Sequence, residues 1–73
     1  MLYNINMKIF GQRLKLLRIE KGLSTMALGK LIGVSDMAIS RWENSKTDIT
    51  SENLVKLAKY FGVSTDYLLG LED

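Results

Sequence analysis

The feature that most constrains the fold of this chain is the short connection between two amphipathic helical stretches, the three residues Gly33-Val34-Ser35. A connection this short forces the second helix to cross the first steeply. Such a crossing needs a small residue at the closest approach, and Gly29 supplies one although glycine costs up to about 1 kcal/mol in a helix interior. The turn also needs a residue that accepts a positive φ, which Gly33 does. We therefore expect two crossed helices with apolar residues filling the space between them, namely Leu28, Ile32, Val34, Ile39 and Trp42.

The spacing of apolar residues along the whole chain predicts five short helices and no strand, an all-α fold. We expect the helices at about residues 7–21, 25–32, 35–44, 51–61 and 65–69. Serine or threonine caps stand at positions 24, 35, 50 and 64, and glycines at 22, 33, 62 and 70 mark helix ends. The expected organisation is an N-terminal arm at residues 1–6, one compact domain at 7–71 and a C-terminal tail at 72–73.

Composition excludes several classes of chemistry. The 73 residues include no cysteine and no histidine, which removes disulfides, thiolate zinc sites and imidazole acid–base catalysis. A chain this short also has little room for a ligand pocket. We therefore predict that the protein is not an enzyme and uses no metal, cofactor or small-molecule ligand. No signal peptide and no apolar run of about 18 residues is present, so we expect a cytoplasmic protein without a membrane partner.

The net charge of +2 conceals an uneven distribution. Residues 7–47 hold eight Lys and Arg against three Asp and Glu, whereas residues 48–73 hold two against five. A basic segment beside an acidic one is typical of a domain that presents one face to a polyanion. Chance clustering on a solvated surface is the alternative, and the charges alone leave both interpretations open.

Nearly the whole chain, residues 9–71, resembles the helix-turn-helix domain of the Cro/CI/XRE family of phage and bacterial transcriptional repressors. The matching segments are Arg13-Leu14-Lys15-Leu16-Leu17-Arg18, Lys21-Gly22-Leu23-Ser24, Gly33-Val34-Ser35, Ile39-Ser40-Arg41-Trp42-Glu43, and residues 53–59 and 61–70. The resemblance implies a five-helix, lambda-repressor-like fold with the helix-turn-helix at its second and third helices. It also implies a bacterial or phage-encoded, nucleoid-associated regulator that binds double-stranded operator DNA as a homodimer, with the third helix in the major groove. An antitoxin or restriction controller with the same domain, or an interaction module that does not bind DNA, is the alternative.

The resemblance places candidate DNA contacts on the third helix and around it. The residues of that helix turned away from Ile39 and Trp42 are Asp36, Met37, Ser40, Arg41 and Asn44. Helix starts and the turn after the recognition helix add contacts that favour phosphates. These contacts are expected from Thr25, Ser35, Ser45 and Lys46. The hydroxyl groups of Ser35 and Ser40 can bond either a phosphate or a base edge. Ser45 stands where the family often has glycine, so the turn there either adopts a costly positive φ or differs from the family's turn.

Three residues of the third helix each have two roles open to them. Arg41 either donates two hydrogen bonds to guanine O6 and N7 or binds a phosphate, and absence of any DNA contact is the further alternative. Met37 either touches a thymine methyl group or fills a gap as a flexible apolar side chain. Asp36 either accepts a hydrogen bond from cytosine N4 or complements the helix dipole in the first turn, and we favour the second role.

Two further sets of residues concern assembly rather than DNA contact. The family resemblance implies an ion pair between Arg18 and Glu43 that orients the recognition helix. It also indicates a subunit contact at the C-terminal end, formed by Tyr67, Leu68, Leu69 and Leu71. A second apolar stripe on the first helix, Ile9, Leu16 and Ile19, lies apart from its core-facing residues. We expect this stripe to be covered by the arm residues Leu2, Tyr3 and Ile5 or by another subunit; scattered exposed apolar residues are the alternative.

Overall fold

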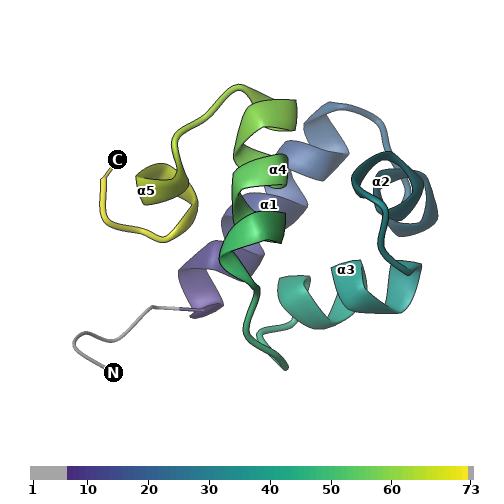
Figure 1. Ribbon diagram of the computed structural model, residues 1–73, viewed down its shortest axis with the longest axis horizontal. Coiled ribbons are helices and arrows are strands. Elements are labelled where there is room, and N and C mark those ends of the chain that lie inside the picture. The colour runs from purple at the N-terminus through teal and green to yellow at the C-terminus, as the bar shows by residue number, and fades with distance from the viewer. Residues whose placement is uncertain (1–6, 73) are drawn as a thin grey trace.

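The computed structural model describes residues 7–72, which form five helices and no strand (Figure 1). The helices are α1 (Met7–Glu20), α2 (Thr25–Ile32), α3 (Asp36–Glu43), α4 (Ser51–Phe61) and α5 (Thr65–Leu68). The helix α1 packs against both α3 and α5, while α2 packs against α3 and α4. In Figure 1, α5 lies on the opposite side of α1 and α4 from α2 and α3. The predicted all-α fold is confirmed for this part of the chain.

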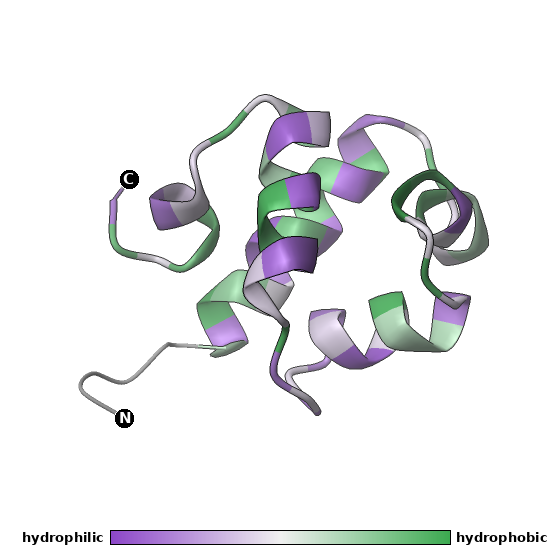
Figure 2. Ribbon diagram, viewed as in Figure 1, coloured by the Kyte–Doolittle hydropathy of each residue, from purple (hydrophilic) through white to green (hydrophobic). Residues whose placement is uncertain are grey.

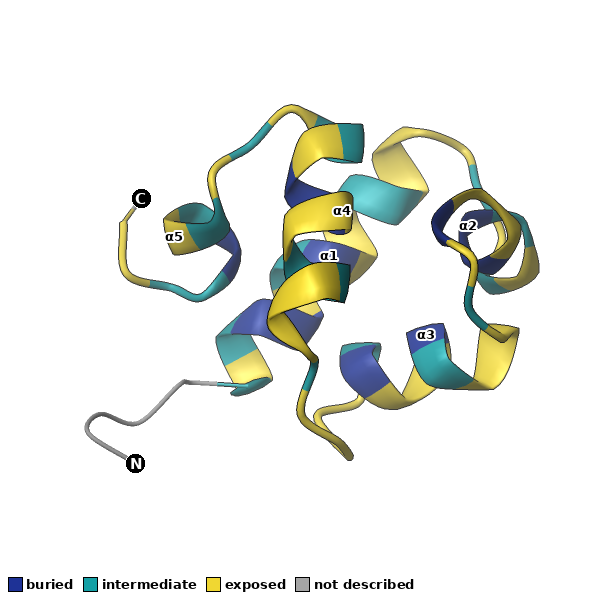
Figure 3. Cartoon of the chain, in the orientation of Figure 1, coloured by how far each residue is buried: buried dark blue, intermediate teal, exposed yellow. Residues whose placement is uncertain are grey.

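One apolar core joins all five helices. Every helix combines hydrophobic and hydrophilic stretches (Figure 2), and each contributes buried residues (Figure 3). The buried members are Phe10, Leu14, Leu28, Ile32, Ile39, Trp42, Leu57, Ala58 and Leu68. Within residues 7–72 no polar or charged residue falls in the buried class, so the domain interior is apolar. No helix in this part of the chain is both long and apolar enough to cross a membrane.

Four of the predicted helix starts have the expected side-chain caps. The hydroxyl oxygens of Ser24, Ser35, Thr50 and Ser64 accept hydrogen bonds from the backbone N–H three residues later, at donor–acceptor distances of 3.0, 3.1, 3.3 and 2.9 Å. Each bond satisfies a donor that the first helical turn would otherwise leave open. The predicted caps at positions 24, 35, 50 and 64 are therefore confirmed.

Four helix ends differ from the prediction by one residue, and two of these are the ends of α3, which spans Asp36–Glu43 rather than residues 35–44. The helix α1 ends at Glu20 rather than at residue 21, and α5 ends at Leu68 rather than at residue 69. At the end of α1 the Gly22 N–H bonds the Ile19 carbonyl and the Leu23 N–H bonds the Arg18 carbonyl. This pair of hydrogen bonds is typical of a helix that is followed by a residue in the left-handed region, here Gly22 with a φ of 69°. The regular helix therefore ends before the glycine.

Two glycines permit close backbone contacts around α3. A Cβ on Gly29 would lie 2.6 Å from the Val34 carbonyl oxygen, which confirms the predicted close approach and places it at the turn between the helices. A Cβ on Gly11 would lie 2.5 Å from the Glu43 carbonyl oxygen and 2.7 Å from that of Trp42. The contact between α1 and the end of α3 therefore requires glycine at position 11, a constraint that the helical periodicity does not indicate.

Candidate nucleic-acid interface

The α2 and α3 helices form the crossed pair that the sequence predicts. Gly33 has a φ of 88° and lies in the left-handed region. Its backbone N–H and that of Val34 both bond the Gly29 carbonyl, at 2.7 and 2.8 Å. This compact turn sends the chain directly into the Ser35 cap of α3. The turn thereby fixes the direction in which α3 leaves α2.

The helix α3 has one buried side and one exposed side. Ile39 and Trp42 belong to the core, whereas the predicted outward residues are exposed. The structure thus brings together on one exposed surface the candidates Asp36, Met37, Ser40, Arg41 and Asn44. A helix anchored on one side and open on the other can enter a groove without losing its packing.

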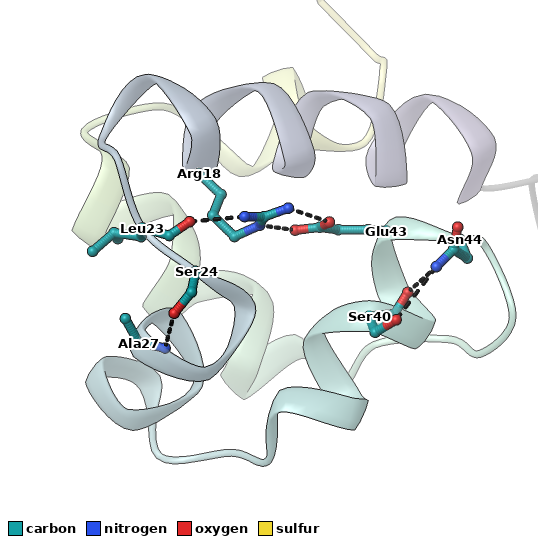
Figure 4. A network of polar contacts seen from close by, with 7 residues as sticks. All are labelled: Arg18, Leu23, Ser24, Ala27, Ser40, Glu43 and Asn44. Atoms are coloured by element: carbon teal, nitrogen blue, oxygen red, sulfur yellow. Dashed lines mark hydrogen bonds and ion pairs between the residues drawn. The ribbon is translucent and has the colours of Figure 1, made fainter.

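The side chain of Asn44 is already engaged within α3. Its Nδ2 donates to the Ser40 carbonyl at 2.8 Å, and it lies 3.4 Å from the Ser40 hydroxyl oxygen (Figure 4). The carbonyl of Ser40 also accepts from the Asn44 backbone N–H at 3.0 Å. Asn44 therefore caps the end of the helix, and contact with DNA would use only the rest of its amide group.

The two helix starts nearest this surface differ in what they expose. The Ser35 residue is exposed, and its hydroxyl accepts the capping bond from Ala38, which leaves its own O–H free to donate. Thr25 is half-buried at the first position of α2. Hydroxyl donation to a phosphate is therefore sterically easier at Ser35 than at Thr25.

In the turn after α3, Ser45 has the positive φ that is the costlier of its two predicted conformations. Its φ is 60°, and it is the one non-glycine residue with positive φ among residues 7–72. The Ser45 N–H bonds the Trp42 carbonyl at 3.2 Å, and the Lys46 N–H bonds the Arg41 carbonyl at 2.8 Å. The Ser45 hydroxyl donates to the Met7 carbonyl at 2.9 Å. Both donors of Ser45 are thus used within the domain, while the Lys46 side chain is exposed.

The predicted ion pair between Arg18 and Glu43 forms with two parallel hydrogen bonds (Figure 4). Arg18 Nε lies 2.6 Å from Glu43 Oε2, and Arg18 Nη2 lies 3.0 Å from Oε1. The remaining Nη1 donates to the Leu23 carbonyl at 2.7 Å, just before α2. The side chains of Arg18 and Glu43 are only 13% and 6% exposed. One guanidinium therefore connects α1, the start of α2 and the end of α3.

Hydrogen bonding to Glu43 raises the pKa of Arg18 above its ordinary value, burial opposes this shift, and the charge of Glu43 adds to it. Because the pKa is raised in the folded state, the contribution to stability is fully present below the ordinary arginine pKa. It would be lost only as the pH rises through the higher folded value. Arg18 itself therefore stays charged and confers no pH dependence on the domain near neutrality.

The crossed pair of α2 and α3 lies within a segment that matches a known protein family. The family described as Helix-turn-helix matches residues 14–68, which span the core of all five helices. The chain belongs to the helix-turn-helix family. The resemblance predicted for residues 9–71 is thereby confirmed at the level of the family.

Several known helix-turn-helix proteins are similar to this domain. It is 43% identical over 65 residues to the repressor protein C2 of Salmonella phage P22, covering 89% of this chain and 30% of that protein. It is 38% identical over 64 residues to the transcriptional activator BcrR of Enterococcus faecalis, covering 88% of this chain and 31% of that protein. The domain therefore spans about a third of the length of these two relatives.

Solved structures show the same fold. The P22 c2 repressor in complex with a synthetic operator matches with a TM-score of 0.82 and 42% identity, covering 88% of this chain and 97% of that one. The restriction-modification controller protein C.AhdI of Aeromonas hydrophila matches with a TM-score of 0.78 and 31% identity, covering 89% of this chain and 98% of that one. The predicted lambda-repressor-like architecture is confirmed by the first of these neighbours.

The four residues predicted to form a subunit contact differ in how far they are buried. Leu68 is fully buried in the core of its own subunit, so the expectation that it contacts a partner is corrected. Tyr67 and Leu69 are half-buried, and Leu71 is 58% exposed. A four-residue helix is too short for its spacing to indicate which side faces inward. Tyr67, Leu69 and Leu71 are therefore the members of the predicted contact that reach the surface, and the contact itself stays a prediction.

The three residues of the predicted second apolar stripe on α1 differ in their exposure. Leu16 and Ile19 are exposed, at 61% and 54%, whereas Ile9 is half-buried. The side chain of Ile9 lies against Gly70, where an added Cβ would approach its Cγ2 to 2.9 Å. The arm predicted to cover the stripe, Leu2, Tyr3 and Ile5, lies outside the described residues.

The surface of residues 7–72 has no pocket. No group of His, Cys, Asp or Glu side chains in this range could hold a metal ion. The candidate site of the domain is thus the exposed face of α3 with its flanking helix ends.

Proposed function

We propose that this helix-turn-helix domain binds double-stranded DNA at specific sequences and acts as a transcriptional repressor. The exposed face of α3 carries the proposal, because it presents Met37, Ser40 and Arg41 to solvent while the opposite face is anchored in the core. A helix with its side chains measures about 10–12 Å across, which fits the roughly 12 Å width of the major groove. Similarity to the P22 c2 repressor in complex with a synthetic operator, over 97% of that chain, supports DNA binding by this domain.

Arg41 is the residue we assign to base reading. Its side chain is exposed, and it makes no hydrogen bond to the other residues of the described range. A guanidinium that is free in this way can donate two parallel bonds to guanine O6 and N7. Met37 lies four residues earlier on the same face and is 58% exposed, so its thioether is placed to contact a thymine methyl group. Asp36 stands in the first turn of α3, where it complements the helix dipole.

Phosphate contacts are assigned to the groups that surround the recognition face. The hydroxyl of Ser35 and the ammonium of Lys46 are exposed on either side of α3. Thr25 adds the N-terminal backbone of α2, where helix N–H groups favour an anion. These contacts would fix the position of the domain on the duplex without reading its sequence.

The proposal includes a homodimer on a two-fold related site. The apolar surface of Tyr67, Leu69 and Leu71 lies at the C-terminal end, away from α2 and α3 (Figure 1). A dimer formed there would leave the recognition helix of each subunit open to DNA. Two half-sites one helical turn apart, about 34–36 Å, are the expected spacing for such a pair.

The first experiment measures affinity for random duplex DNA across salt concentrations. A DNA-binding domain that neutralises several phosphates loses affinity with a slope of about −0.9 per phosphate on logarithmic axes. A slope near zero would instead support a protein-interaction module that has lost DNA binding. The second experiment selects bound sites from random DNA and returns the half-site sequence and spacing together.

The assignment of Arg41 is tested on the selected site. Arg41→Ala should relax preference at one base pair and cost about 1–3 kcal/mol there. The matched control is Lys59→Ala, which removes one positive charge from the exposed side of α4. A uniform loss of affinity across all sequences would move Arg41 to the phosphate-binding residues.

A restriction controller is the second candidate within the same function. Similarity to C.AhdI over 98% of that chain favours it. The genomic position of the selected sites separates the two candidates. Sites beside restriction-modification genes would favour the controller, and sites beside phage genes would favour the repressor.

A further inference from the structure

Arg13 joins α1 to the segment that follows α5. One terminal nitrogen, Nη1, donates to the Tyr67 carbonyl and, at 2.7 Å, to the Glu72 carbonyl. The guanidinium also lies over the Tyr67 ring, 4.3 Å from its centroid. These partners are 54 and 59 residues away in sequence, so the contact is entirely tertiary.

The same segment is held at two more points. Gly70 rests directly on the Ile9 side chain of α1. The hydroxyl of Ser64, just before α5, donates to the side-chain carboxylate of Glu72. Backbone bonds from Gly70 to Tyr67 and from Leu71 to Asp66, at 3.1 and 2.8 Å, close the turn. Gly70 and Glu72 thus both contact α1, and Leu71 between them bonds to α5.

This seating determines where Leu71 points. Leu71 is 58% exposed although the residues on both sides of it are held by α1 or α5. The segment therefore presents an apolar side chain outward from a fixed backbone. An apolar residue held in this way suits a contact with a second copy of the chain better than one on a loose tail, since less conformational entropy is lost on association.

We infer that Arg13 is a positioning residue that sets the geometry of the homodimer, and through it the spacing of the two half-sites. This inference rests on the proposed function, because it presumes a dimer on DNA. Arg13 acts through the Tyr67 and Glu72 carbonyls rather than through DNA. Arginine suits the role because its planar group donates two bonds while stacking on a ring, which a lysine ammonium does not reproduce.

The test compares full and single half-site duplexes with the complete chain. Arg13→Ala should reduce the affinity ratio between full and single half-site by roughly tenfold, and it should broaden the preferred spacing. Affinity for the single half-site should stay within about twofold, because α3 is unchanged. Arg13→Lys should fall between the wild type and Arg13→Ala. The matched control is Lys15→Ala, an exposed positive charge on the same helix.

A measurement without DNA tests the local step. Hydrogen exchange of the Gly70 and Leu71 amides should accelerate by roughly tenfold in Arg13→Ala, while core amides such as that of Leu28 keep their protection. Equal loss on full and single half-sites, or unchanged exchange at residues 70–71, would overturn the inference. A wild-type chain that binds neither duplex would refute the proposed function instead, and the two failures are thereby distinguished.

Discussion

Two arginines of α1 hold different parts of the domain in different ways. Arg18 pairs with a carboxylate that is 6% exposed, and the pair lies between α1, α2 and α3. Arg13 has no carboxylate partner within residues 7–72 and donates to two backbone carbonyls near the surface. Loss of a partner at Arg18 leaves a charge without compensation in a poorly hydrated place, whereas carbonyls freed from Arg13 can bond water. We therefore expect removal of one partner at the Arg18 pair to destabilise the fold, and removal of Arg13 to affect mainly the position of the segment after α5.

The largest expected effect comes from removing the carboxylate partner of Arg18. Glu43→Ala should reduce the free energy of unfolding by about 3 kcal/mol, because it leaves the Arg18 guanidinium unpaired. DNA affinity should fall with it, since the end of α3 loses its connection to α1. Thermal unfolding followed by Trp42 fluorescence and a DNA titration measure the two effects. An unchanged melting temperature with lower affinity would contradict an orienting role that acts through the fold.

A double substitution separates orientation from stability on that side. Replacing the pair with apolar residues, Arg18→Met with Glu43→Leu, is expected to keep most of the stability, because buried ion pairs often recover little more than their desolvation cost. If this variant melts like the wild type but binds DNA more weakly, the pair serves orientation. Equal stability with equal affinity would show that any well-packed pair suffices.

The next effect tests the backbone contact between α1 and α3. Gly11→Ala should destabilise the domain by about 2 kcal/mol, because its Cβ would meet two carbonyl oxygens of α3 that cannot move independently. Gln12→Ala, at the exposed neighbouring position, is the control and should remain near the wild type. Denaturant unfolding measures both. A neutral Gly11→Ala would mean that α1 and α3 can separate without loss.

A smaller effect concerns a third region of α1, the exposed Leu16 and Ile19. Deletion of residues 1–6 should lower stability by about 1 kcal/mol or weaken self-association, if those residues cover the stripe, because apolar area returns to water. Substituting Leu16→Gln and Ile19→Gln in the full chain should have the same effect, and the deletion should then add nothing. Unchanged melting and unchanged oligomeric state would refute the predicted cover.

The smallest expected effect concerns Ser45, in the turn after α3. Ser45→Gly should stay within about 0.5 kcal/mol of the wild type, because relief of the positive φ offsets the lost bond to Met7 and the greater freedom of glycine when unfolded. Ser45→Ala keeps the strained φ and loses the bond, so it should cost about 1 kcal/mol. Chemical denaturation of both variants measures the difference. Equal stabilities would show that the hydroxyl bond contributes nothing.

The sequence predicts most of the fold because its signals are local. Caps such as Ser24 and terminal residues such as Gly33 act within a few positions of their helix ends, and all five helices follow from them with apolar spacing. The bonds of Arg13 span more than fifty positions and carry no local signal. The need for glycine at position 11 arises only once α1 and α3 are packed. For the same reason the burial of Leu68 requires the tertiary structure.

The candidate DNA surface is predictable to a similar degree. The outward face of α3 follows from helical spacing, since the positions of Ile39 and Trp42 define the opposite side. The internal bonds of Asn44 and Ser45 do not, because they depend on where the helix ends and on the carbonyl of Met7. Family resemblance supplied the pairing of Arg18 with Glu43, which spacing alone does not indicate.

The helix α1 contacts both the recognition helix and the segment after α5, and it is a continuous rod of 14 residues, about 21 Å long. The contacts of α1 with the α3 side, at Gly11 and Arg18, alternate along this rod with its contacts to the segment after α5, at Ile9 and Arg13. Both neighbours therefore rest on the same stretch of about three turns of α1, and a displacement of those turns would move the two neighbours together.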